Sequence, residues 1–119
     1  MPALVVEGSD LEVRLSPLEK LGAMRGDVAI PLSSVTAVRV SDHPWSELRG
    51  LRAPGTGIPG VLSLCTRRGS GFRDFAAVYL RKPAVVLEAE GAEFDRLVIS
   101  SSDACAQARR IEQALARRP

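Results

Sequence analysis

The stretch from Val61 to Leu80, VLSLCTRRGSGFRDFAAVYL, decides the fold class of this chain. Two apolar segments, Val61–Thr66 and Phe72–Leu80, flank the turn sequence Arg67-Arg68-Gly69-Ser70-Gly71. Short apolar segments on either side of a glycine-containing turn are typical of two antiparallel strands. We therefore expect a β-hairpin here and a chain built mainly from strands.

Segments of the same kind lie on both sides of this hairpin. Downstream, Ala84–Ala89 and Phe94–Ser100 are separated by short turns, so the last four strands predict an antiparallel meander. Upstream, four further segments predict strands: Ala3–Glu7, Leu11–Leu15, Val28–Pro31 and Val35–Val40. In Leu11–Leu15 the apolar and charged residues alternate, which indicates a strand with one wet face.

Two segments carry helical signals instead. Ser16 and Glu19 have the spacing of a capping box around Pro17, which predicts a short helix with Leu18 and Leu21 on one side. Near the end of the chain, Ser102 or Asp103 can cap a second helix. Its apolar residues recur with helical spacing and form one stripe that predicts packing on a sheet: Ala104, Ala108, Ile111 and Leu115.

Composition indicates one ordinary domain spanning residues 1–119. The chain has 119 residues, is 45% apolar and carries a net charge of +2, so it can bury a single core. It has no basic leader pattern and no apolar run long enough for a membrane helix, which favours a cytoplasmic location. Cys65 and Cys105 lack metal or disulfide spacing, so we expect both to be small buried residues.

The segment from Gly55 to Gly60, GTGIPG, spells G-x-G-x-x-G. A dinucleotide site needs a strand before this motif and a helix after it. Here a proline-containing loop precedes it, a strand pattern follows, and Pro59 lacks a backbone N–H. We therefore interpret it as a glycine-rich turn within an irregular segment, residues 42–60, in which Asp42 caps one helical turn. The sequence predicts no cofactor.

The segment Val28–Val38, VAIPLSSVTAV, together with the order of elements, resembles bacterial pleckstrin-homology-like (PH-like) domains and small uncharacterised actinobacterial proteins. The resemblance implies a bent antiparallel sheet or partly open barrel of seven to eight strands, capped by the C-terminal helix. It also implies a non-catalytic binding or assembly module rather than an enzyme. The first hairpin loop, Gly8-Ser9-Asp10, lacks the spaced basic residues that phosphoinositide-binding members carry there.

The turn between the two central strands is the main candidate binding site. Arg67, Arg68 and Arg73 surround it beside Phe72, and guanidinium groups in such a cluster can hold a phosphate, an anionic headgroup or an acidic peptide. The alternative is that these arginines are solvated while Phe72 enters the core. Trp45 and Arg52, from the 42–60 loop, are further candidates for contacts with a partner.

Other function classes have weaker support. His43 is the single histidine, and a catalytic triad could combine it with a serine and an aspartate (Ser33, Ser34 or Ser46, and Asp42 or Asp74), but no G-x-S-x-G frame is present. The competing hypothesis is a small enzyme or ligand-binding barrel that uses His43 and the 42–60 loop. We expect no metal site and no nucleic-acid binding, because metal-ligand spacings and aromatic–basic platforms are absent from the sequence. A protein partner, or a second copy joined through an edge strand, agrees with the pattern.

Overall fold

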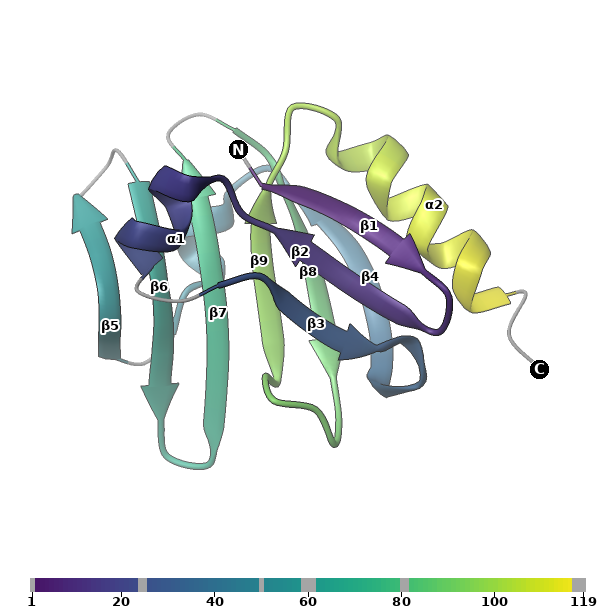
Figure 1. Cartoon of the computed structure of the whole chain (residues 1–119), viewed down its shortest axis with the longest axis horizontal. Coiled ribbons are helices and arrows are strands. Elements are labelled where there is room, and N and C mark those ends of the chain that lie inside the picture. The colour runs from purple at the N-terminus through teal and green to yellow at the C-terminus, as the bar shows by residue number, and fades with distance from the viewer. Residues whose placement is uncertain (1, 24–25, 50, 59–61, 80–81, 117–119) are drawn as a thin grey trace.

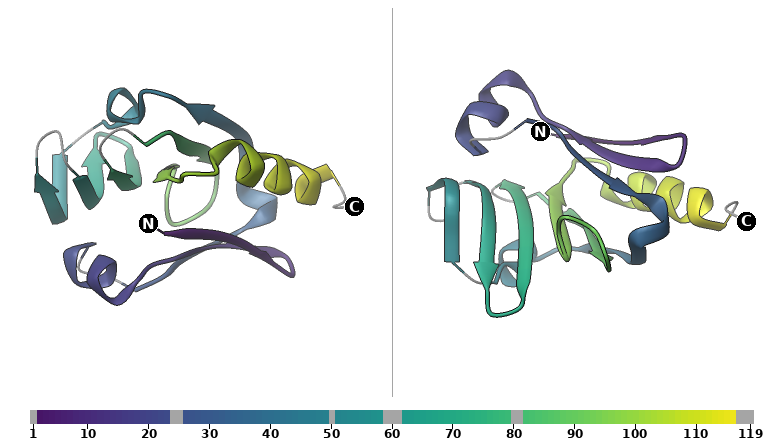
Figure 2. Two further views of the ribbon diagram at one scale, coloured as in Figure 1. Left: turned by 90° about the horizontal axis from the view of Figure 1, so that it is seen from above. Right: turned by 60° about the horizontal axis from the view of Figure 1, so that its bottom comes forward.

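The computed structural model describes residues 2–23, 26–49, 51–58, 62–79 and 82–116, and for residues 51–58 the backbone alone. The described chain is mainly β with a C-terminal helix, as expected, and its strands form two sheets rather than one bent sheet (Figure 1). The smaller sheet has the order β1-β2-β3 and is antiparallel; its strands are β1 (Ala3–Glu7), β2 (Asp10–Arg14) and β3 (Val28–Pro31). The two sheets face each other and are not closed into a barrel (Figure 2).

The larger sheet has the order β4-β8-β9-β7-β6-β5. Its strands are β4 (Val35–Ser41), β5 (Leu51–Ile58), β6 (Leu62–Gly69), β7 (Phe72–Tyr79), β8 (Ala84–Ala89) and β9 (Arg96–Ser100). The β6–β7 hairpin is confirmed, with Gly69 opposite Phe72. The expected meander is wrong beyond it, because β9 lies between β7 and β8 and runs parallel to β7. Four consecutive residues of β9, 97–100, are buried, as in a strand that is covered on both faces.

The first helix, α1 (Pro17–Ala23), begins with the predicted capping box. The backbone N–H of Ser16 donates to Glu19 Oε1 at 2.8 Å, and the N–H of Glu19 donates to Ser16 Oγ at 3.2 Å. Its apolar side does not face the core: Leu18 and Leu21 are 80% and 76% exposed. Glu19 is buried instead, because the hydroxyl of Tyr79 in β7 donates a hydrogen bond to its carboxylate.

The C-terminal helix, α2 (Ala104–Ala116), packs against β4 and β8 and runs beside β1 (Figures 1 and 2). Its predicted stripe is confirmed at Ala104, Ala108 and Ile111, which are buried. Ala114 is also buried, while Leu115 packs at the margin of the core. The last buried position of this face is therefore Ala114, one residue before Leu115, which the sequence pattern indicated.

The interpretation of residues 42–60 as an irregular segment is wrong for its second half. β5 pairs with β6 along its length, and Gly55, Thr56 and Gly57 lie opposite Cys65, Leu64 and Ser63. The glycine motif is therefore strand up to Ile58, while Pro59 and Gly60 lie outside the described residues. β5 is an edge strand with a register shift between Arg52 and Gly55, where a proline is tolerated in a sheet.

Two short 3₁₀ helices, η1 (Leu32–Ser34) and η2 (Pro44–Glu47), complete the described elements. The helical turn expected within residues 42–48 is η2, but Asp42 does not cap it. His43 occupies the N-cap position and makes no capping hydrogen bond through its side chain.

The main core fills the space between the two sheets and α2. Phe75 of β7 contacts Phe94 there with ring centroids 5.7 Å apart, and Leu11 of β2 and Leu97 of β9 lie in the same cluster. A smaller apolar cluster covers the other face of the large sheet: Cys65, Ala76, Val78, Ala84, Val86 and Val98. Trp45, within η2, packs on this second cluster.

The two cysteines differ in exposure. Cys65 is buried, whereas Cys105 is exposed, so the prediction that both are buried is wrong for Cys105. Cys105 follows Ala104 on α2 and lies outside the buried stripe of that helix.

Among the described helices, none combines the length and the apolar character that a membrane crossing requires.

Candidate functional site

The end of the β6–β7 hairpin divides the predicted arginine cluster between the two faces of the sheet. Strand pairing places Arg68 opposite Arg73 and Arg67 opposite Asp74. Since successive side chains in a strand point to opposite faces, Arg68 and Arg73 share the face that carries Phe75. Arg67 lies on the other face, so the predicted three-arginine site contains only two arginines.

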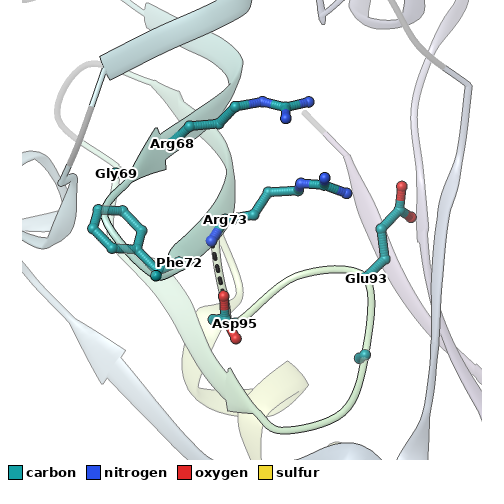
Figure 3. A pocket seen from close by; sticks show the side chains of 8 residues that line it. Arg68, Gly69, Phe72, Arg73, Glu93 and Asp95 are labelled. Carbon is teal, nitrogen blue, oxygen red and sulfur yellow. Dashed lines mark hydrogen bonds between the residues drawn. The ribbon is translucent and has the colours of Figure 1, made fainter.

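Arg68 and Arg73 extend in the same direction from the hairpin (Figure 3). Arg68 is exposed and Arg73 is half-buried. Within the described ranges, neither guanidinium makes a hydrogen bond or an ion pair. Like charges directly opposite each other on neighbouring strands repel, so an anion bound between them would remove an unfavourable interaction.

A cavity of about 490 Å³ lies beside these arginines. Its remaining lining comes from the hairpin turn and from the β8–β9 loop: Gly69, Gly71, Phe72, Ala92, Glu93 and Asp95. Asp95 is tied to the backbone of Arg73, because Asp95 Oδ2 accepts from the Arg73 N–H at 2.8 Å and the Asp95 N–H donates to the Arg73 carbonyl at 2.7 Å. Glu93 faces the cavity from across the loop (Figure 3). The cavity therefore carries charges of both signs.

The sequence alone did not identify the contribution of Glu93 and Asp95. These residues are about twenty positions from Arg73 along the chain. They reach it because β9 lies beside β7, with Arg96 opposite Asp74. No local spacing encodes this neighbourhood, because strand order in a sheet depends on the whole fold.

The other face of the hairpin is a structural ion-pair site. Arg49 donates from Nε to Asp74 Oδ2 at 2.6 Å and from its terminal nitrogen to Asp74 Oδ1 at 3.0 Å. The hydrogen bonds to Asp74 raise the pKa of the Arg49 guanidinium, which outweighs the lowering effect of burial. The same guanidinium lies 4.2 Å above the ring centroid of Phe72, and Arg67 Nε donates to the Arg49 carbonyl at 3.1 Å. Arg67 is therefore held at this ion-pair site and not at the cavity, whereas the Phe72 ring lines the cavity and also packs under Arg49.

The remaining sequence candidates do not join this site. Trp45 is half-buried on the opposite face of the large sheet, and its Nε1 is buried without a hydrogen-bond partner among the described residues. Arg52 lies in β5 opposite Arg67, and its side chain is outside the described part of the structure. The side chain of His43 is exposed, while both oxygens of Asp74 are occupied by Arg49. The structure therefore does not pair His43 with Asp74.

No group of three or more histidine, cysteine or acidic side chains that could hold a metal ion occurs in the described ranges. Comparison with known proteins returns no match, either to a protein-family model, to a curated protein or to a solved structure. The resemblance to PH-like domains therefore stays a prediction, and the function has to be argued from the geometry of the site.

Proposed function

We propose that this chain is a non-catalytic binding module in which Arg68 and Arg73 hold an anionic group of the partner. One observation carries the proposal: two arginines lie directly opposite each other in the strand register beside a cavity, and neither guanidinium has an ion-pair partner in the described chain. Guanidinium groups bind carboxylate and phosphate through parallel hydrogen bonds, which favours these anions as the recognised group.

The surroundings of the two arginines agree with this role. They project from a paired hairpin rather than from a free loop, so their backbone is fixed before a ligand arrives. Asp95 binds the Arg73 backbone on both sides and holds the β8–β9 loop against the hairpin. Because Glu93 and Asp95 lower the local positive potential, we expect modest affinity and a preference for anionic groups small enough to reach between the arginines.

Retention on phosphocellulose with rising salt tests the proposal. The double variant Arg68→Ala/Arg73→Ala should elute at clearly lower salt than the wild-type chain, because retention by ion pairing falls as salt rises. Arg109→Ala/Lys82→Ala is the matched control: it removes two exposed cations that lie outside the cavity lining and also lack ion-pair partners among the described residues. If both double variants shift equally, retention depends only on net charge and the proposed site is wrong. Arg67 is not changed, because its hydrogen bond to the Arg49 carbonyl supports the fold.

We also infer a cytoplasmic location for this module. The thiols of Cys65 and Cys105 are both free, and Cys105 is exposed. Exposed free thiols persist in reducing compartments, which supports the inference. Fractionation of the host cell tests it: recovery of the chain with the soluble cytoplasmic proteins is expected, and recovery in a membrane or secreted fraction would contradict it.

A further inference from the structure

A groove of about 390 Å³ lies between β1 and α2, away from the arginine cavity. Its lining consists of Leu4, Val5 and Val6 from β1 and Gln107, Arg110, Ile111, Gln113 and Ala114 from α2. Side chains of consecutive strand residues point to opposite faces. Three consecutive lining residues therefore indicate that the groove follows the edge of β1.

The edge of β1 that borders this groove has no strand partner in the described chain. β1 ends the three-stranded sheet and, in the described chain, pairs only with β2 (Figure 1). An edge strand presents backbone N–H and C=O groups that have no ladder partner, and an extended chain can bind them as an additional strand. Leu4 and Val6 pack against the core, whereas Val5 belongs to neither apolar cluster.

The α2 side of the groove supplies an apolar base and two polar groups, Gln107 Oε1 and the Arg110 guanidinium, that lack partners among the described residues. Ile111 and Ala114 are 2% and 8% exposed and form the base. Gln107 Oε1 is buried and, among the described residues, has no hydrogen-bond donor. A buried acceptor without a hydrogen bond costs free energy, and a hydrogen-bond donor from an incoming chain would remove this cost.

The charge at the groove favours extended chains that carry an acidic side chain. Arg110 is exposed at the groove and makes no ion pair in the described ranges. None of the described residues that line the groove is acidic, and Arg110 gives this lining a positive charge, in contrast to the mixed charges of the arginine cavity. A carboxylate on the incoming chain would complement Arg110.

We propose that this groove binds an extended peptide segment of a partner protein, which adds to β1 as a fourth strand and places an acidic side chain next to Arg110. Apolar side chains at alternate positions of the segment face Ile111 and Ala114. The Gln107 Oε1 atom accepts a hydrogen bond from the bound segment. This site is independent of Arg68 and Arg73, so either proposal can fail alone.

The test is an NMR titration of the full chain with three blocked seven-residue peptides. In each, valine alternates with serine, and the central residue is glutamate, glutamine or lysine. With the glutamate peptide we expect saturable amide shifts confined to residues 3–7 and 107–114 at peptide concentrations up to about 1 mM. The affinity should be highest for the glutamate peptide, lower for the glutamine peptide and lowest for the lysine peptide. Absence of such shifts with all three peptides, or equal affinity for all three, would overturn the proposal.

Variants on α2 separate recognition from folding. Arg110→Glu should lower the affinity for the glutamate peptide about fivefold and raise the affinity for the lysine peptide. Arg109→Glu, at an exposed position outside the groove lining, should change both affinities by less than about twofold. Gln107→Leu should weaken binding without lowering the melting temperature of the free chain. Equal effects of the two arginine variants would contradict the proposal. Light scattering that shows a dimer dissociating in Arg110→Glu would assign the groove to a second copy of the chain instead.

Discussion

Asp74 is 2% exposed, and both of its carboxylate oxygens accept hydrogen bonds from Arg49. If Arg49 is replaced by Met, a buried carboxylate keeps its desolvation cost but loses its cation. We expect this change to lower the free energy of unfolding by about 3 kcal/mol, at the low end for a buried pair because the Arg49 side chain is 37% exposed. Urea denaturation followed by the fluorescence of Trp45, the single tryptophan, measures the loss.

The double variant Arg49→Met/Asp74→Leu is the control for this prediction. It removes both charges, so a large part of the stability should return. A double variant as unstable as the sum of the two single variants would show that Arg49 and Asp74 do not interact.

Tyr79 is the single tyrosine, so its ionisation can be followed by ultraviolet absorbance. Burial, and then the hydrogen bond and negative charge of Glu19, raise the pKa of the Tyr79 hydroxyl. Because the folded pKa is raised, the stabilisation is complete below the unfolded pKa of about 10 and is lost as pH rises through the folded value. We expect tyrosinate to form only together with alkaline unfolding. Tyrosinate that appears near pH 10, about its ordinary pKa, in a chain still folded would contradict this account.

Among the elements, the β6–β7 hairpin depends on a glycine for its packing. A Cβ atom added at Gly69 would lie 2.3 Å from the Phe72 ring, which is opposite it in the register and under the Arg49 guanidinium. Gly69→Ala therefore has to displace the ring, and we expect a loss of about 1–3 kcal/mol in urea unfolding. Ser70→Ala, at an exposed turn position, is the control and should change stability little. Equal stability of the two variants would show that the ring moves without cost.

The contact between β4 and η2 predicts an acid sensitivity. Arg39 donates to Glu47 Oε1 at 2.6 Å, and this hydrogen bond lowers the pKa of the Glu47 carboxyl against the raising effect of burial. A lowered folded pKa means that the stabilisation is present above the unfolded pKa, about 4.3, and is lost as pH falls through the folded value. Arg39→Gln should therefore make stability less dependent on pH in this acidic range. Unchanged acid-unfolding curves for Arg39→Gln would contradict the assignment.

In the whole molecule, the two sheets and α2 separate two candidate binding surfaces. The arginine cavity is at the β6–β7 turn of the large sheet, and the groove lies where the edge of the small sheet meets α2. Among the described lining residues, the first surface has both signs of charge around the guanidiniums of Arg68 and Arg73, and the second combines apolar side chains and two glutamines with Arg110. The two surfaces could therefore recognise different parts of one partner.

Local patterns were sufficient to predict the elements whose partners are near in sequence. The glycine turn set the β6–β7 register, Ser16 and Glu19 formed their capping box, and most of the α2 stripe is buried. Each of these depends on interactions within one helix or between consecutive strands. The mainly β fold with a terminal helix could be predicted for the same reason.

The arrangement of distant segments could not be predicted from the sequence. The parallel pairing of β7 and β9 brings Asp95 to Arg73, and nothing in the local sequence indicates this pairing. Leu18 is exposed because the Glu19 side of α1 is held against Tyr79 across sixty residues. The candidate site was therefore found in part: Arg68 and Arg73 are adjacent as expected, while Arg67 belongs to the opposite face.

The central claim, that Arg68 and Arg73 together hold an anion, is tested most directly by NMR of the arginine side-chain Nε–Hε groups during titration with pyrophosphate at constant ionic strength. We predict that the signals of Arg68 and Arg73 shift together with one saturating curve, while the signal of Arg109 on α2 does not move. Shifts of all exposed arginines in proportion, or no saturable shift of Arg68 and Arg73, would contradict the account.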